Sequence, residues 1–185
     1  MPPKVKITKE DIVNAAVEMV RKNGEKEINA RSLAAFLGCS TQPVFSNFAS
    51  MDDLKRAMLE KALQVFENYM AKETESGKYP PYKSKGMAYI RFAKEEKELF
   101  KLLYMRERRE ESFKKETDMF DRTVETVMDN TFLKEDTARL FHLEMWMYVH
   151  GIATMFATGY LDPDWELVSQ MLTDSYLGLK KQFGV

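Results

Sequence analysis

The sequence predicts an all-α protein with a small N-terminal three-helix unit followed by a larger helical domain. Apolar residues recur at helical spacing along most of the 185 residues, and alternating runs of β-branched residues are few. Only six prolines and eight glycines interrupt this pattern. We expect residues 1–50 to form the small unit and residues 51–185 the larger one, linked by a helix over 51–74.

The composition is that of an ordinary globular protein, with 44% apolar and 31% charged residues. The formal net charge is −1, although residues 1–50 carry seven basic and five acidic side chains, a net of +2. Contact with a polyanion would therefore depend on a local patch and on helix N-termini. The single cysteine excludes a disulfide framework and favours a reducing, cytoplasmic setting. We expect neither a membrane span nor a signal peptide.

A first helix is expected to begin after Thr8, which forms an approximate capping box with Asp11. It should end at Asn23-Gly24, after an apolar stripe that faces the core. The short arm before this helix carries Lys4 and Lys6. These two lysines either contact phosphate or belong to a solvated tail.

Residues 29–48 are predicted to form two short helices that meet at a sharp bend. Asn29 is a suitable N-cap for the first helix, and Gly38 stands where a helix needs a left-handed residue to end. Ser40 is expected to cap the second helix, with Pro43 in its first turn. The apolar residues expected to face inward are Leu33, Ala34, Phe36 and Leu37 in the first helix and Val44, Phe45 and Phe48 in the second. The short polar side chains expected to face outward are Thr41, Gln42, Ser46 and Asn47.

This stretch resembles the helix-turn-helix of the tetracycline-repressor (TetR) family of bacterial transcription regulators. The matching positions are Leu33-Ala34, Leu37-Gly38-Cys39-Ser40, Phe45-Ser46-Asn47-Phe48, Met51 and Leu54. Two of them depart from the family pattern, because a tyrosine that usually meets a phosphate is Phe45 and a lysine that usually opens the next helix is Met51. Both changes remove a contact to the DNA backbone and keep the apolar bulk.

The resemblance implies a set of DNA-contacting residues. Arg31 and Ser40 are expected on phosphates, and Thr41, Gln42, Ser46 and Asn47 on bases or phosphates. Pro43 and Phe45 belong to the same surface, and Lys4 and Lys6 to the arm.

Beyond the linking helix, Ser76–Tyr82 is the clearest loop in the chain. Helices are expected over 87–94, 98–106 and 113–130, and the mixed-sign charges at 106–111 form a solvated face. Residues 145–160 are apolar or small nearly all round, so this helix needs cover on several sides. A last helix begins after Asp164.

The apolar excess of these last two helices predicts a two-fold homodimer. The expected interface residues are Met155, Phe156, Gly159, Trp165, Val168, Leu172 and Tyr176. The spacing of Trp146, His150 and Gly151 also resembles the Trp-x-x-x-His-Gly signature of one class of TetR C-terminal domain.

The sequence carries no motif for catalysis. His142 and His150 lie eight residues apart, too far to ligate one metal ion together, and no nucleophile or phosphate-loop pattern is present. We therefore expect no enzyme, cofactor or metal. The thirteen methionines and twelve phenylalanines fit a core, and the family resemblance adds an effector pocket for a small apolar molecule. The pocket residues implied in this way are Phe66, Met87, Phe100, Tyr104, Met119, Phe120, His142 and Met145.

The expected function is a ligand-responsive dimeric repressor that binds a palindromic double-stranded DNA operator. The alternative is an adaptor of the same fold that binds a small molecule or a protein and has weak or no DNA binding. Phe45 and Met51 are the residues that favour the alternative.

Overall fold

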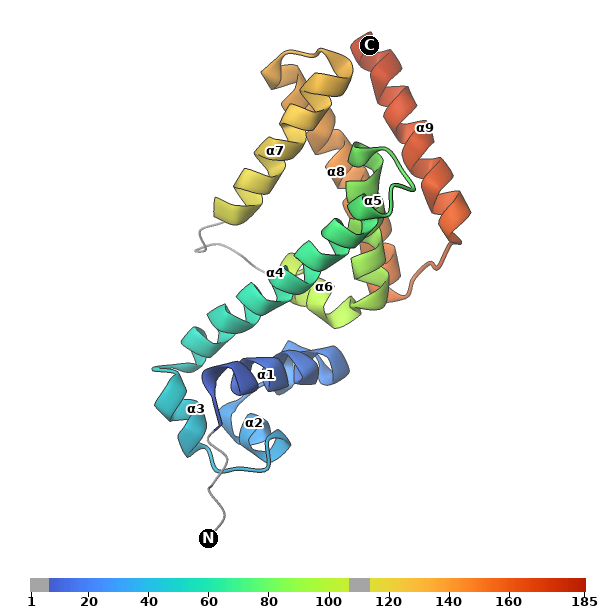
Figure 1. Cartoon of the computed structure of the whole chain (residues 1–185). Helices are drawn as coiled ribbons and strands as arrows, with labels where there is room; N and C mark the ends of the chain where they lie inside the picture. The colour runs from blue at the N-terminus through green and yellow to red at the C-terminus, as the bar shows by residue number, and fades with distance from the viewer. Residues whose placement is uncertain (1–6, 107–113) are drawn as a thin grey trace. The chain divides into compact units, whose positions relative to one another are not determined.

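A computed structural model of the chain describes residues 7–106 and 114–185 (Figure 1). These residues form nine α-helices and a short 3-10 turn at Glu25–Glu27, without a strand, which confirms the all-α prediction. The helices are α1 (Lys9–Asn23), α2 (Ala30–Phe36), α3 (Gln42–Asn47), α4 (Met51–Glu75), α5 (Pro81–Glu95), α6 (Lys97–Tyr104), α7 (Lys114–Thr131), α8 (Glu135–Thr158) and α9 (Trp165–Phe183). Among the described helices, none is both long and apolar enough to cross a membrane.

The chain divides into two compact units. Unit 1 comprises Met1–Asn68 and Glu96–Arg106, and unit 2 comprises Tyr69–Glu95 and Glu107–Val185. Unit 1 therefore holds α6 and most of α4 in addition to the three N-terminal helices. This division differs from the expected one at residue 50, because α6 packs against α1 despite their separation in sequence.

Unit 1 is built around α1, whose inner face is buried from Ile12 to Val20. The capping box predicted for its first turn is present, since Thr8 Oγ1 accepts from Asp11 N at 3.1 Å and Asp11 Oδ2 accepts from Thr8 N at 2.9 Å. Hydrogen bonds to the carboxylate from the Thr8 hydroxyl, at 2.7 Å, and from Thr8 N lower the pKa of Asp11. At the other end, Arg21 donates two hydrogen bonds to the carboxylate of Glu96, at 2.8 and 2.9 Å, and so ties α1 to the start of α6.

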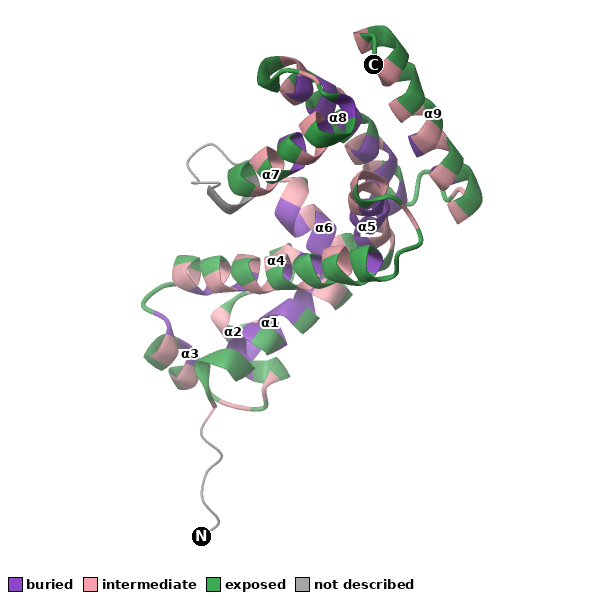
Figure 2. Ribbon diagram, turned by 45° about the horizontal axis from the view of Figure 1, so that its top comes forward, coloured by how far each residue is buried: buried purple, intermediate pink, exposed green. Residues whose placement is uncertain are grey.

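Unit 2 is built around α5, seven of whose 15 residues are buried. The helix expected over 87–94 begins earlier, at Pro81. Proline is tolerated at this first position because the N–H group that it lacks would have no hydrogen-bond partner within the helix. Gly86 lets the neighbouring helices approach closely: a Cβ there would lie 3.3 Å from Leu172 of α9 and 3.4 Å from Val149 of α8. Figure 2 shows α9 to be mainly exposed or intermediate, and only Val168 and Leu172 of that helix are buried.

Two tyrosine–histidine pairs join α5 to α8. The Tyr82 hydroxyl forms a hydrogen bond with Nδ1 of His142 at 3.0 Å, and the Tyr89 hydroxyl forms one with Nδ1 of His150 at 2.9 Å. His142 is 9% exposed, and burial, followed by the nearby charge of Lys85, lowers its pKa to about 4. Burial likewise lowers the pKa of His150 and raises that of Tyr82. Both imidazoles are therefore neutral near pH 7.

We predict that protonation of His142 opposes folding in mild acid. The unfolded chain takes up this proton near pH 6.5 and the folded chain only near pH 4, so the stabilisation is complete above pH 6.5 and is lost as the pH falls towards 4. The full effect is roughly 3 kcal/mol. Urea unfolding of the wild type and of His142→Asn, which keeps an acceptor for Tyr82, should show a steeper acid loss for the wild type. Parallel pH profiles would contradict the prediction.

Candidate functional site

The helix α2 begins at a fully formed cap. Asn29 Oδ1 accepts from the backbone N–H groups of Arg31 and Ser32, at 3.1 and 3.0 Å, and Ser32 Oγ accepts from Asn29 N at 3.1 Å. Two of the N–H groups that a helix start leaves open are satisfied in this way. The predicted cap is therefore confirmed, and it aims the exposed Arg31 away from the buried pair Leu33 and Ala34.

The bend after α2 depends on Gly38. Its φ of +66° lies in the left-handed region, although a Cβ there would meet nothing within 4 Å, so the backbone rather than space requires glycine. The N–H of Cys39 donates to the Ala34 carbonyl at 2.9 Å, which closes the end of the helix. Phe36, predicted to face inward, is 47% exposed and lies beneath the ammonium of Lys22, 5.5 Å from its ring centre.

The second helix of the motif, α3, begins one residue later than expected. Thr41 rather than Ser40 occupies the N-cap, and no side chain makes the capping bond. Pro43 lies in the first turn, as predicted. The helix is anchored by Val44 and Phe48, which are 1% and 3% exposed.

The outer face of α3 consists of Gln42, Phe45 and Ser46. Phe45 was expected to face inward with Val44 and Phe48, but it is 59% exposed, because two adjacent residues lie 100° apart on a helix and a six-residue helix buries only one side. Thr41 is half-buried. Asn47 is also half-buried, and its amide donates to the Pro43 carbonyl at 2.8 Å.

The segment that forms α2 and α3 is almost free of charge. Residues 28–50 contain one charged side chain, Arg31, in a chain that is 31% charged. The segment therefore brings no carboxylate of its own to a phosphate, and polar side chains of this size hydrogen-bond to base edges. Lys4 and Lys6 lie outside the described residues.

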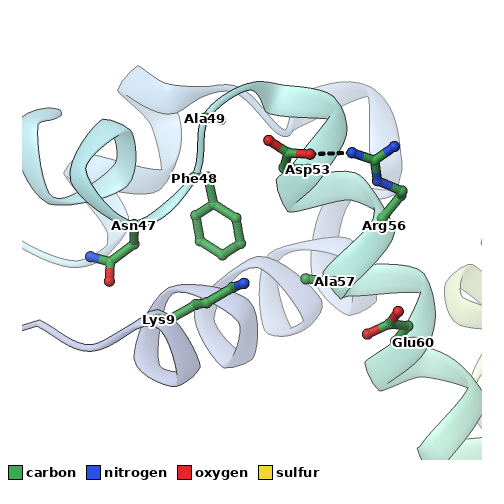
Figure 3. Close-up of a pocket in the computed structure, with 8 residues that line it drawn as sticks. All are labelled: Lys9, Asn47, Phe48, Ala49, Asp53, Arg56, Ala57 and Glu60. Atoms are coloured by element: carbon green, nitrogen blue, oxygen red, sulfur yellow. Dashed lines mark hydrogen bonds and ion pairs between the residues drawn. The ribbon is translucent and has the colours of Figure 1, made fainter.

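A cleft lies beside this surface, where the chain passes from α3 to α4 (Figure 3). Lys9 Nζ stands 5.1 Å from the ring centre of Phe48, and Arg56 pairs with Asp53. Glu60 supplies a second carboxylate, so two cations and two anions line the cleft. This balance gives the cleft no preference for a ligand of either charge. The remaining lining residues are Asn47, Ala49 and Ala57.

The eight residues proposed for an effector pocket do not fall into one unit. Phe66, Phe100 and Tyr104 belong to unit 1, where the Tyr104 ring contacts both phenylalanines at 5.8 and 5.3 Å between ring centres. The unit 2 residues are Met87, Met119, Phe120, His142 and Met145. Of these, Phe120 and His142 contact each other directly, with ring centres 4.5 Å apart.

The residues proposed for a dimer interface are divided between core and surface. Phe156, Val168 and Leu172 are at most 3% exposed within the single chain. They therefore pack the core of unit 2 instead of forming part of the predicted interface surface. Met155 and Gly159 are exposed, and Trp165 and Tyr176 are half-buried. Trp165 stacks on Phe156 at 5.7 Å between ring centres.

An exposed apolar stripe runs along α8, and only Met155 of it was expected at an interface from the sequence. Leu140, Leu143, Met147 and Met155 are 48%, 38%, 61% and 41% exposed, and their spacing of three, four and eight residues places them on one face. A Cβ at Gly151, on the same face, would meet nothing within 4 Å. This spacing was visible in the sequence, but the equally apolar opposite face concealed which side is buried.

The described residues contain no group of three or more His, Cys, Asp or Glu side chains that could hold a metal ion. The absence of an enzymatic function stays an expectation.

The chain was compared with known proteins. Residues 83–175 match a family model described as a tetracyclin repressor-like C-terminal domain, a range that includes Trp146, His150 and Gly151. Among solved structures, a TetR-like transcriptional regulator from Rhodococcus sp. RHA1 superposes with a TM-score of 0.70 at 17% sequence identity, over 97% of this chain and 98% of that one. A search of curated sequences found no match. The matched domain spans half of the chain, and the helix-turn-helix stands ahead of it, so this protein belongs to the TetR family of transcriptional regulators.

Proposed function

We propose that the protein is a ligand-responsive transcriptional repressor that binds a palindromic DNA operator as a homodimer. The observation that carries the proposal is the outer face of α3, where Gln42, Phe45 and Ser46 are exposed within a segment, residues 28–50, that carries one positive and no negative charge. A short helix of this kind enters the major groove with its first residues at base edges.

The proposed DNA contacts follow from the exposure and the hydrogen-bonding groups of each side chain. Gln42 stands in the first turn of α3 and can pair with adenine through both ends of its amide. Ser46 and Thr41 supply hydroxyls, and Arg31 and Ser40 are exposed beside them for phosphates. Asn47 is the least suited of these residues to contact DNA, because its side-chain amide already donates to the Pro43 carbonyl.

The proposed dimer joins the exposed stripe on α8 with the outer face of α9. Leu167 and Leu177 of α9 are 49% and 56% exposed, and a Cβ at Gly178 would meet nothing within 4 Å. Two copies of such a helix pair can pack as a four-helix bundle. Two-fold symmetry would then present two α3 helices to a palindrome with half-sites about 34–36 Å apart.

Unit 2 is the proposed effector-binding unit. Phe120, His142 and Met145 lie together there, and methionine side chains adapt to ligands of varied shape. Effector binding would shift the protein between states that differ in DNA affinity.

Replacement of Gln42 by alanine should relax operator preference. Loss of a bidentate adenine contact removes about 1–3 kcal/mol of discrimination, whereas non-specific affinity depends on phosphate contacts. Gel-shift titrations should use a duplex selected from a random pool and a scrambled duplex of the same composition. Arg31→Ala is the matched control and should weaken both complexes alike. Equal losses on both duplexes for Gln42→Ala would remove Gln42 from the base contacts.

Replacement of Met147 by glutamate should split the dimer. The wild type is expected to sediment near twice the 21.6 kDa chain mass and the variant near 21.6 kDa, because an apolar interface does not accept two unpaired carboxylates. Gln64→Glu, which adds the same charge at an exposed position of α4, should remain dimeric. A wild-type monomer at micromolar concentration would overturn the homodimer.

Replacement of Met51 by lysine tests the adaptor alternative. A lysine at the start of α4 should restore one phosphate contact, which steepens the dependence of log affinity on log salt by about 0.9 per subunit. Ala71→Lys adds the same charge twenty residues further along the helix and should leave the slope unchanged. Should neither the wild type nor Met51→Lys prefer any duplex, the adaptor function would replace the repressor.

A further inference from the structure

Lys85 lies where α5 faces α7, and its partners there are hydroxyl groups. Its ammonium donates to Thr123 Oγ1 at 3.2 Å and to Thr126 Oγ1 at 3.3 Å. Both hydroxyls already donate to carbonyls of their own helix, that of Thr123 to Met119 at 2.8 Å and that of Thr126 to Arg122 at 3.1 Å, so they act on Lys85 as acceptors. An ammonium has three N–H donors, and these bonds use two of them.

The charge of Lys85 is not neutralised by an ion pair with the described residues. Burial lowers its pKa, as does the charge of Arg122; Glu125 acts in the opposite direction but forms no ion pair with it. Arg91 of the same helix shows the usual solution, an ion pair with the buried carboxylate of Glu73 at 3.0 Å. A half-buried cation held only by hydroxyls lacks the favourable partner that would offset its desolvation.

Aromatic and apolar surface adjoins this cation. Lys85 lies close enough to His142 for its charge to lower the pKa of that imidazole, and the Phe120 ring packs on the same imidazole at 4.5 Å. Tyr82 stands one turn before Lys85 on α5 and is hydrogen-bonded to His142. The buried side chain of Met145 lies one turn after His142, in the cluster that also holds Phe120.

The boundary between α5 and α7 is the less tightly packed side of α7. This helix packs extensively on α8 and only slightly on α5. The half-buried Met119 lies one turn before Thr123, on the face of α7 that Lys85 contacts. Flexible thioether side chains can reorganise around an inserted group at little energetic cost.

We propose that the Lys85 cluster, formed by Tyr82, Lys85, Thr123, Thr126 and His142, binds the anionic head of an amphipathic organic anion, with the apolar body of that molecule between α5 and α7. This inference rests on the proposed effector-binding role of unit 2 and names the chemical class of the effector. The carboxylate or sulfonate head accepts the third N–H of Lys85, and the body packs on Phe120 and Met145. The apolar effector expected from the sequence thus acquires a negative charge.

The test compares two fluorescent probes with the same rings. One is 8-anilinonaphthalene-1-sulfonate, and the other is N-phenyl-1-naphthylamine, which lacks the sulfonate. The full chain should bind the sulfonate with saturation. Lys85→Met should weaken that binding about tenfold, the effect of one charge-assisted hydrogen bond, and leave the neutral probe within twofold.

Lys83→Met is the matched control. Lys83 lies on the same helix and also donates to a hydroxyl, that of Thr173 at 2.7 Å, so its loss removes the same charge from outside the cluster. Both probes should bind this variant as they bind the wild type. A proton NMR titration adds an independent readout: the saturating sulfonate should raise the pKa of His142 in the wild type and not in Lys85→Met.

Three results would overturn the proposal: no saturable sulfonate binding to the wild type, equal effects of Lys85→Met on the two probes, or equal effects of the two lysine variants. None of them involves DNA. Loss of the Lys85 site would therefore leave the gel-shift experiment on Gln42 and the sedimentation experiment on Met147 unaffected. Failure of those two experiments would in turn leave the anion site in place.

Discussion

The burial of α5 is the constraint on which unit 2 depends. A helix enclosed on most sides can expose few charges, yet α5 carries Lys83, Lys85, Arg91 and Lys94. Each of these side chains reaches out of the core to a partner from another element: a hydroxyl of α9, hydroxyls of α7, the carboxylate of Glu73, or Asp162 after α8. The long stems of lysine and arginine make this possible, since they bury methylene groups and carry the charge outward.

Unit 1 meets a different requirement, because it has to hold a very short helix with one face open. With six residues, α3 is too short to be stable by itself, so its position depends on Val44 and Phe48 and on the bend at Gly38. The outer face of α3 carries no charged side chain because so few positions of this short helix face outward. Two turns of helix offer only three or four outward positions, and here they are given to Gln42, Phe45 and Ser46.

The sequence predicted the helices well where capping residues marked their ends. Thr8, Asn29 and Asp164 accept the backbone bonds expected of an N-cap, whereas Ser40 does not cap α3. Predictions about which side of a helix is buried were less successful. Phe45 is exposed and Phe156 is buried because periodicity identifies an apolar face without identifying what covers it, and in α8 both faces are apolar. Lys85 could not be found from sequence, since its role depends on hydroxyls that lie 38 and 41 residues away.

The two tyrosine–histidine hydrogen bonds also restrict how unit 2 can move. The tyrosines lie seven residues apart on α5 and the histidines eight apart on α8, so they form two rungs between helices that run in the same direction. Sliding one helix along the other by a single turn would separate both tyrosine–histidine pairs and break both hydrogen bonds at once. Axial sliding is therefore disfavoured, and α5 and α8 behave as one rigid ladder. A rearrangement of this unit is then a tilt of α7 or α9 against that ladder, with the rungs intact.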